Sequence, residues 1–199
     1  MSVTASDVKA LRDRTGAGTM DAKRALEEAE GDADRAVEIL RVKLGKNVAK
    51  LSGREAGEGT VQAYIHATGK VGVLVEVDCN TDFVATNPEF VAFAKDVALH
   101  VAGSPTVQWV SDEDVPEEAR EAERRVFEQQ ASDKADDVRP KIVEGKLEKW
   151  LDDVVLLRQV HVNREKHEEK SIQQLRDELA AKTGENLVVR RFAKFTVGE

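Results

Sequence analysis

Residues 61–77 read VQAYIHATGKVGVLVEV, and this stretch decides the fold of the chain. Apolar and polar side chains alternate from Val61 to His66, a short turn-forming segment follows, and the alternation resumes from Val71 to Val77. A period of two on both sides of a polar turn is typical of a β-hairpin. We therefore expect two antiparallel strands here, and a third over 187–197, where most alternate residues are again apolar.

Flanking helices are expected in the sequence after the hairpin and before the third strand. Asn87 followed by Pro88 is a good helix start, because asparagine caps a helix and proline suits its first position. The helix after it has an apolar stripe, and another is expected from Ser171 to Gly184. Helices beside a small antiparallel sheet predict an α+β fold.

The first 45 residues predict a module of three short helices. Thr4 and Asp7 form a capping box for the first helix, and Gly31 closes the second. Thr19 is expected to cap the second helix and Asp32 the third. Such short helices are stable only when packed together, and the pattern resembles the ubiquitin-associated domain. Glycines at 45, 53, 57 and 59 predict a linker over 46–59, followed by an α+β core domain over 60–199.

The most charged part of the chain, about 112–158, predicts an inserted helical hairpin. Its first half has few apolar residues, and its second half, with Val143, Leu147, Trp150 and Leu151, has the apolar side chains to pair with it. The charges most simply form a solvated face. We therefore expect a coiled-coil-like arm projecting from the sheet.

Composition excludes several classes of protein. Acidic residues number 38 and basic residues 30, a formal net charge of −8, so direct nucleic-acid binding is not expected. Cys79 is the only cysteine, which suits a reducing compartment. No signal peptide or membrane-length apolar run is evident, so the chain is expected to be cytoplasmic.

The sequence contains no obvious enzyme centre. Cys79 and His66 are the one pair that suggests a thiol nucleophile, but Cys79 shares a strand face with core valines. Gly16-Ala17-Gly18 lacks the rest of a phosphate-binding loop. The histidines have no metal-ligand spacing, so neither a metal nor a cofactor is expected; they are His66, His100, His161 and His167.

Two apolar residues beside turns are ambiguous from the pattern alone. Phe83 follows the polar turn after the second strand, and its pattern favours burial under the next helix. Exposed, it would be a binding anchor. Met20 beside the glycine turn is as compatible with an exposed contact as with a core position.

Two longer stretches resemble signatures of the bacterial elongation factor Ts family. The first is LRDRTGAGTMDAKRAL at 11–26, and the second is YIH at 64–66 with GVLVEVDCNTDFVA at 72–85. The similarity extends to Val143-Glu144-Gly145-Lys146 and to the final strand. Thr19, Ala22 and Asp78 depart from the common pattern, and the core occurs once rather than twice, as in a short form of the family.

The resemblance implies a guanine nucleotide exchange factor for elongation factor Tu, with no catalytic centre of its own and no cofactor. It would bind that GTPase in its GDP-bound and nucleotide-free states. The resemblance also implies that Asp82 and Phe83 contact the partner beside its Mg²⁺ site. For Phe83, this replaces the buried position that the pattern alone favours. The residues it assigns are Thr81, Asp82, Phe83 and Val84 for displacing Mg²⁺, and Arg12, Met20 and His66 for other partner contacts.

Two alternatives stay open at this point, an adaptor resembling a ubiquitin-associated domain and a thiol enzyme using Cys79.

A sheet of about three strands is marginally stable on its own and leaves its edges exposed. With a single core copy, we expect a homodimer in which a partner subunit covers an exposed edge of this sheet.

Overall fold

The protein is described by a computed structural model that covers residues 3–15 and 17–198. The chain forms two compact units. Unit 1 comprises the residues up to Glu55 together with Asp177–Leu187, and unit 2 comprises Ala56–Arg176 together with the residues from Val188. The predicted turn at Gly16 lies outside the described residues.

Unit 1 begins with three helices, α1 (Ala5–Thr15), α2 (Thr19–Glu28) and α3 (Ala33–Leu51). The capping box is confirmed, since the Thr4 amide donates to Asp7 Oδ2 at 2.9 Å and the Asp7 amide donates to Thr4 Oγ1 at 3.2 Å. Asp32 caps α3 by accepting from the amides of Asp34 and Arg35. The helices share one core, which consists of Val8, Leu11, Ala22, Ala25, Leu26, Ala29, Ala36 and Leu40.

Two local predictions for this unit are wrong. Gly18, not Thr19, occupies the cap position of α2, and no side chain caps that helix. Helix α3 continues through Gly45 to Leu51, so the first part of the expected linker is helical. The chain after α3 is bonded within unit 1, because Arg54 Nη1 donates to the Gly184 carbonyl at 3.1 Å and Asn186 Nδ2 donates to the Arg54 carbonyl at 2.9 Å. These two bonds hold the chain that directly follows α3 against residues 184–186.

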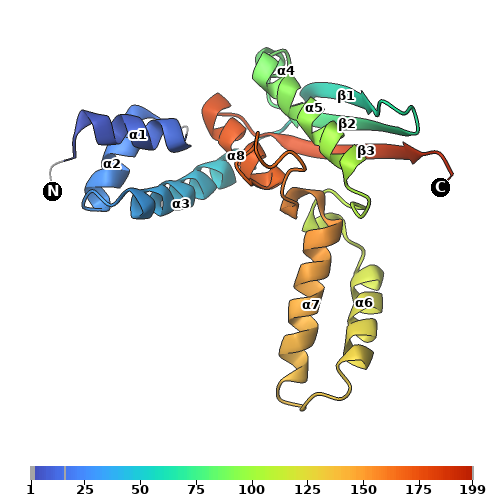
Figure 1. The fold of residues 1–199 in the computed structure, drawn as a ribbon. Coiled ribbons are helices and arrows are strands. Elements are labelled where there is room, and N and C mark those ends of the chain that lie inside the picture. The colour runs from blue at the N-terminus through green and yellow to red at the C-terminus, as the bar shows by residue number, and fades with distance from the viewer. Residues whose placement is uncertain (1–2, 16, 199) are drawn as a thin grey trace. The chain divides into compact units, whose positions relative to one another are not determined.

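Unit 2 is built on an antiparallel sheet of β1 (Glu58–Ile65), β2 (Val71–Cys79) and β3 (Val188–Thr196), with β2 in the centre. Val73, Val75 and Val77 on β2 are buried, and helix α5 (Pro88–Gly103) packs against β1 and β2 (Figure 1). The Asn87 side chain caps α5, as predicted. The α+β class is therefore confirmed.

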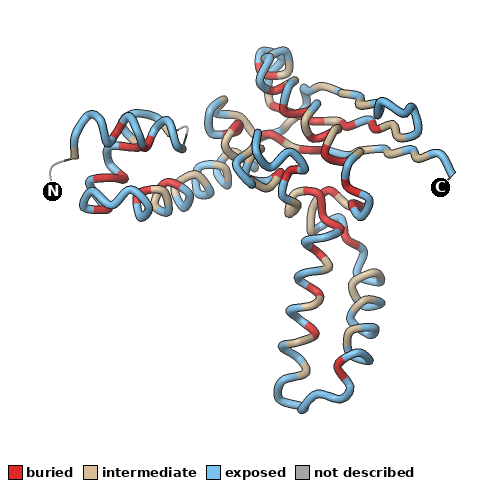
Figure 2. Tube along the Cα trace, viewed as in Figure 1, coloured by how far each residue is buried: buried red, intermediate tan, exposed pale blue. Residues whose placement is uncertain are grey.

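Helices α6 (Glu117–Gln130) and α7 (Arg139–Val154) form an arm that extends away from the sheet in Figure 1. Helix α6 contains no buried residue, whereas α7 buries one stripe, visible as red segments in Figure 2. The stripe consists of Val143, Leu147, Leu151 and Val154. At the base of the arm, Leu151 and Val154 join Val115 and Val155 in a small core flanked by two tryptophans, Trp109 and Trp150.

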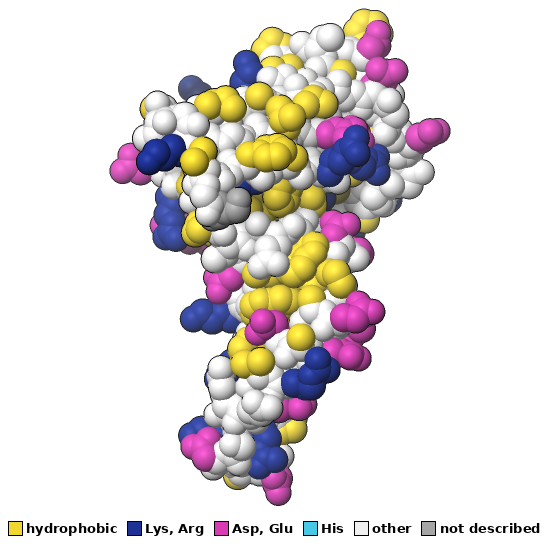
Figure 3. Space-filling view, turned by 90° about the vertical axis from the view of Figure 1, so that its right-hand side faces the viewer, with side chains coloured by type: hydrophobic (Ala, Val, Ile, Leu, Met, Phe, Trp, Pro, Cys, Tyr) yellow, Lys and Arg dark blue, Asp and Glu magenta, His cyan; other side chains and the backbone are white. Residues whose placement is uncertain are grey.

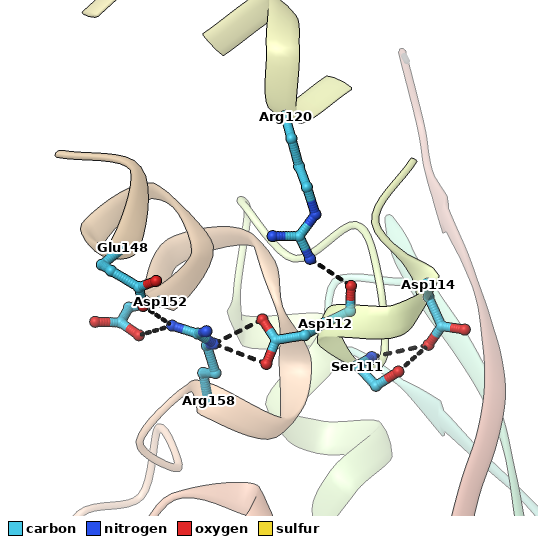
Figure 4. Close-up of polar contacts among 7 residues, drawn as sticks. All are labelled: Ser111, Asp112, Asp114, Arg120, Glu148, Asp152 and Arg158. Atoms are coloured by element: carbon cyan, nitrogen blue, oxygen red, sulfur yellow. Dashed lines mark hydrogen bonds and ion pairs between the residues drawn. The ribbon is translucent and has the colours of Figure 1, made fainter. Parts of the chain in front are cut away.

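The base of the arm is also fixed by ion pairs around Arg158, in the short helix η2 (Leu156–Arg158) (Figure 4). Its guanidinium contacts Asp112 in η1 (Asp112–Asp114) at 2.8 Å, and Glu148 and Asp152 on α7 at 2.7 and 3.1 Å. Burial opposes the charged form of Arg158, but the hydrogen bonds that its guanidinium donates to these carboxylates outweigh that effect and raise the pKa of Arg158. The network therefore joins the start of the arm to its end.

The outer part of the arm is expected to be dispensable for folding. Removing residues 124–144 and joining the cut ends with a short glycine-serine linker would leave Leu151, Val154 and the Arg158 network intact. Urea denaturation followed by circular dichroism should then show one cooperative transition with an unchanged midpoint for the sheet unit. Loss of the native spectrum would show that the arm belongs to the core.

Candidate partner-binding surface

The short helix α4 (Asp82–Ala85) lies between the end of β2 and helix α5. Thr81 is its N-cap residue, and its hydroxyl oxygen accepts from the Val84 amide at 3.5 Å. The Thr86 hydroxyl donates to the Asp82 carbonyl at 2.9 Å, which closes the turn from the other end. One turn of helix is thus fixed by side chains at both ends.

Buried groups anchor this turn to the sheet. Val84 is buried, and Cys79 is fully buried with its thiol donating to the Thr81 carbonyl at 3.2 Å. Asp78 is buried too and accepts from Arg190 Nε at 2.6 Å. A side chain at Gly59 would come within 2.9 Å of the Asp78 Cα atom, so glycine allows β1 to approach β2 closely here. The turn therefore has a rigid base.

Phe83 projects from this base into solvent. Its exposed fraction is 83%, the largest value among the large hydrophobic residues that the structure describes. The pattern-based interpretation that Phe83 packs under the following helix is therefore wrong, because its neighbour Val84 takes the buried position in the turn. Asp82 is exposed beside it.

His66 lies at the other end of the same hairpin. Glu58 pairs with Cys79 near α4, whereas Ile65 pairs with Gly72 at the turn that carries His66. At about 3.4 Å per residue along a strand, roughly 25 Å of sheet separates the two ends. His66 and the Phe83 turn therefore cannot contact the same point on a partner, and His66 cannot activate the Cys79 thiol.

In unit 1, Arg12 on α1 and Met20 on α2 are exposed, Met20 by 60%. Each lies close in sequence to a core residue that fixes its helix, Leu11 for the arginine and Ala22 for the methionine. The ambiguity over Met20 is thus resolved in favour of exposure.

Two features were not found from the sequence. The face of the sheet opposite α5 carries exposed apolar side chains, because β1 places its alternating apolar residues there. Asp96, His161 and His167 also lie together, although no local spacing connects them. The lack of ligand spacing among the histidines holds along the sequence, and it is the fold that brings two of them beside Asp96. Among the described residues, no helix is both long and apolar enough to span a membrane.

Exposed apolar and basic side chains on well-packed supports are typical of proteins that act through contacts with another protein. Comparison with known proteins identifies the group within this class. A family model described as elongation factor TS matches residues 6–168. The chain belongs to the elongation factor Ts family.

Individual relatives support this assignment over nearly the full chain. The elongation factor Ts of Carboxydothermus hydrogenoformans is 48% identical, with 99% of this chain and 90% of the relative aligned. Those of Caldanaerobacter subterraneus and Thermosipho melanesiensis are 47% and 46% identical, over 98% and 100% of their own lengths and 99% of this chain. Family membership implies nucleotide exchange on elongation factor Tu during translation elongation, rather than catalysis at an enzyme centre.

The geometry of α4 predicts that substitutions at two adjacent residues differ in their effect on stability. Phe83→Ala removes an exposed ring and should leave the free energy of unfolding within about 0.5 kcal/mol of the parent value. Val84→Ala removes buried methyl groups and should cost roughly 1 to 2 kcal/mol. Urea denaturation of both variants measures the difference. Equal losses would mean that the ring of Phe83 packs in the folded protein.

Proposed function

We propose that this chain releases GDP from elongation factor Tu by inserting Phe83 beside the partner's Mg²⁺ and phosphate site. The observation that carries the proposal is the 83% exposure of Phe83 on a turn whose base is buried. An apolar ring held in water by a rigid support loses little conformational freedom on binding and gains from burial in a partner. A factor of translation elongation with this partner works in the cytoplasm.

The proposed mechanism requires no covalent chemistry. Mg²⁺ bridges the nucleotide phosphates and the loops that hold them, so displacing its ligands weakens GDP binding. The exposed carboxylate of Asp82 and the ring of Phe83 would act there, while Thr81 and Val84 hold the turn in place. By linkage, GDP weakens factor binding by the same ratio, and incoming GTP can then displace the factor.

In this proposal, Arg12 and Met20 contribute to the affinity of the chain for elongation factor Tu. A guanidinium and a flexible apolar side chain on unit 1 suit a helix surface of the partner, and such contacts are equally good before and after GDP leaves. Only contacts that improve in the nucleotide-free complex accelerate release. His66, at the far end of the hairpin, would make a further contact of the affinity-setting kind.

Kinetics should separate these two roles. With elongation factor Tu carrying fluorescent GDP, Phe83→Ala should lower the release rate at saturating factor by about tenfold or more, a loss of ~1.4 kcal/mol or more of differential contact. Arg12→Ala and Met20→Ala should raise the half-saturating concentration and keep the maximal rate. Stopped-flow fluorescence measures both parameters.

Val42→Ala is the matched control, since Val42 is exposed by 61% outside the proposed contacts; it should behave as the parent. A folded Phe83→Ala protein with the full saturating rate would refute the role of the ring. Unchanged GDP release with the parent protein would favour an adaptor function instead.

We also propose that two copies of the chain dimerise through the open face of the sheet, defined here as the face opposite α5. Paired residues share a face, and the register places Ala63, Leu74 and Ala193 in one row and Ile65, Gly72 and Phe195 in the next. Five side chains on or beside this face are 48 to 72% exposed: Val61, Ile65, Leu74, Phe195 and Val197. Figure 3 shows hydrophobic side chains gathered on the part of the molecule that carries the sheet.

A second copy suits this face because the same apolar rows can pair with themselves across a twofold axis. A shallow hollow of about 460 Å³ over Ile65, Gly72 and Phe195 could receive a side chain from the other copy. The Glu76–Arg191 ion pair marks the polar end of the face.

Substitution in the open face should separate the copies. Phe195→Glu would place a charge in the proposed contact and should convert the dimer to a folded monomer at micromolar concentration. Val42→Glu, at a similarly exposed position outside the sheet, should remain dimeric. Sedimentation velocity distinguishes the two states, and a parent protein that sediments as a single chain would refute the dimer.

A further inference from the structure

Strand β3 contains a β-bulge beside the end of β2 that leads into α4. Opposite residues 76–77 of β2, the pairing passes from Arg191 directly to Val189, so Arg190 is an extra residue on β3. A bulge of this kind bends its strand and re-aims the side chain of the extra residue. The side chain of Arg190 lies against Asp78, where Nε donates to Oδ2 at 2.6 Å.

The effect of the bulge is visible in the bonds of two neighbouring arginines. Side chains of adjacent residues on a regular strand point to opposite faces. Arg190 and Arg191 nevertheless both bond carboxylates of β2, Arg190 that of Asp78 and Arg191 that of Glu76. These two carboxylates are two residues apart and therefore share a face. The extra residue thus brings a second guanidinium to the end of β2.

The other side of Asp78 is shaped by a glycine. Gly59 on β1 pairs with Asp78, and a Cβ atom at position 59 would lie 2.9 Å from Asp78 Oδ1. Glycine therefore leaves the space that the carboxylate occupies, and Asp78 is only 9% exposed. Burying a carboxylate is costly unless it is paired and hydrogen-bonded. The space at Gly59 and the charge of Arg190 together keep the carboxylate in place.

The guanidinium of Arg190 also reaches the chain before β1. Its Nη2 donates to the Ala56 carbonyl at 3.4 Å, while Nε holds Asp78. One side chain from β3 therefore bonds the residues that lead into β1 and the residue near the end of β2. This arrangement fixes the place at which the chain leaves the sheet.

Bonded neighbours connect Asp78 to the turn that carries Phe83. Cys79, the next residue, is fully buried, and its thiol donates to the Thr81 carbonyl at 3.2 Å. The same carbonyl accepts from the Ala85 amide at 3.0 Å, inside α4. A shift of the strand end would therefore be passed on to α4.

We propose that Asp78 and Arg190 are positioning residues for nucleotide release, which hold α4 so that the ring of Phe83 enters the partner in a fixed orientation. The inference rests on the proposed function of Phe83 and adds that its ring acts only from a fixed turn. A misplacement of about 1 Å at a reacting group is enough for a large loss of rate. The pair therefore governs the maximal rate of GDP release, whereas the contacts of unit 1 govern affinity.

Stopped-flow GDP release from elongation factor Tu tests the role of the pair. Asp78→Ala should lower the rate at saturating factor by roughly three- to tenfold and leave the half-saturating concentration near the parent value. Arg190→Met should cause the same loss, and the double variant should lose no more than either single variant, because each removes one shared contact. Asp78→Asn keeps an acceptor oxygen for Arg190 and should restore most of the rate.

Asp96→Ala is the matched control. Asp96 on α5 pairs with Lys166, in the loop between η2 and α8 (Ile172–Thr183), at the same 2.6 Å as the Asp78–Arg190 pair. In both pairs the cation is about half exposed and the carboxylate is largely covered. Asp96→Ala should keep the parent rate, and circular dichroism verifies that each variant is folded.

Amide hydrogen exchange of the full-length chain, followed by NMR, tests the positioning without the partner. In Asp78→Ala, the amides of Ala85 and Asn87, which are bonded within the turn, should show a severalfold larger increase in exchange than the amide of Val75 at the centre of β2. An equal increase at all three amides would overturn the inference and assign the pair a general role in stability.

The kinetic outcomes separate this inference from the proposed function. A folded Asp78→Ala protein with the full parent rate, beside a slowed Phe83→Ala protein, would overturn the positioning role and leave the proposed function standing. A full rate in Phe83→Ala would instead refute the proposed function and, with it, the effect of the pair on release.

Discussion

The burial of Val73, Val75 and Val77 on one face of β2 is the packing on which the rest of unit 2 depends. Each is at most 2% exposed, and removing such a side chain from water contributes roughly 1.5 to 3 kcal/mol. A shift of β2 by one residue would send all three valines to the opposite face. Their burial therefore fixes the register of β2, and with it the point at which Cys79 ends the strand.

This register determines what both faces of the sheet present. The chain leaves β2 at a fixed place, so the next turn has Val84 buried and Phe83 in solvent. The same pleat turns Leu74 away from α5, into a row with Ala63 and Ala193. An exposed aromatic at one end of the sheet and an apolar open face are thus two consequences of one packing arrangement.

The sequence was sufficient for features that depend on local chemistry. The hairpin, the capping box at Thr4 and the caps at Asp32 and Asn87 all arise from residues close together in the chain. Prediction failed where distant contacts intervene. Helix α3 runs past Gly45 into a segment bonded to residues 184–186, and no periodicity records those bonds.

The candidate site likewise combines features that the sequence indicates with features that it does not. Resemblance selected the Phe83 turn, but the pattern alone favoured burial, since hydrophobicity cannot distinguish which of two adjacent apolar residues, Phe83 or Val84, faces inward in a single helical turn. The histidine cluster was missed for a different reason. Asp96 and His161 are far apart in the sequence and meet only because the loop folds back on α5, so ligand spacing gave no signal.

The division of the chain into two compact units bears directly on how such a factor could release nucleotide. Arg12 and Met20 belong to unit 1, whereas Phe83 belongs to unit 2. Binding through one unit raises the effective concentration of the other at the partner's surface. In the proposed mechanism, contacts of unit 1 that are indifferent to nucleotide would supply affinity, and the contact of Phe83 would form only as the partner's phosphate site opens.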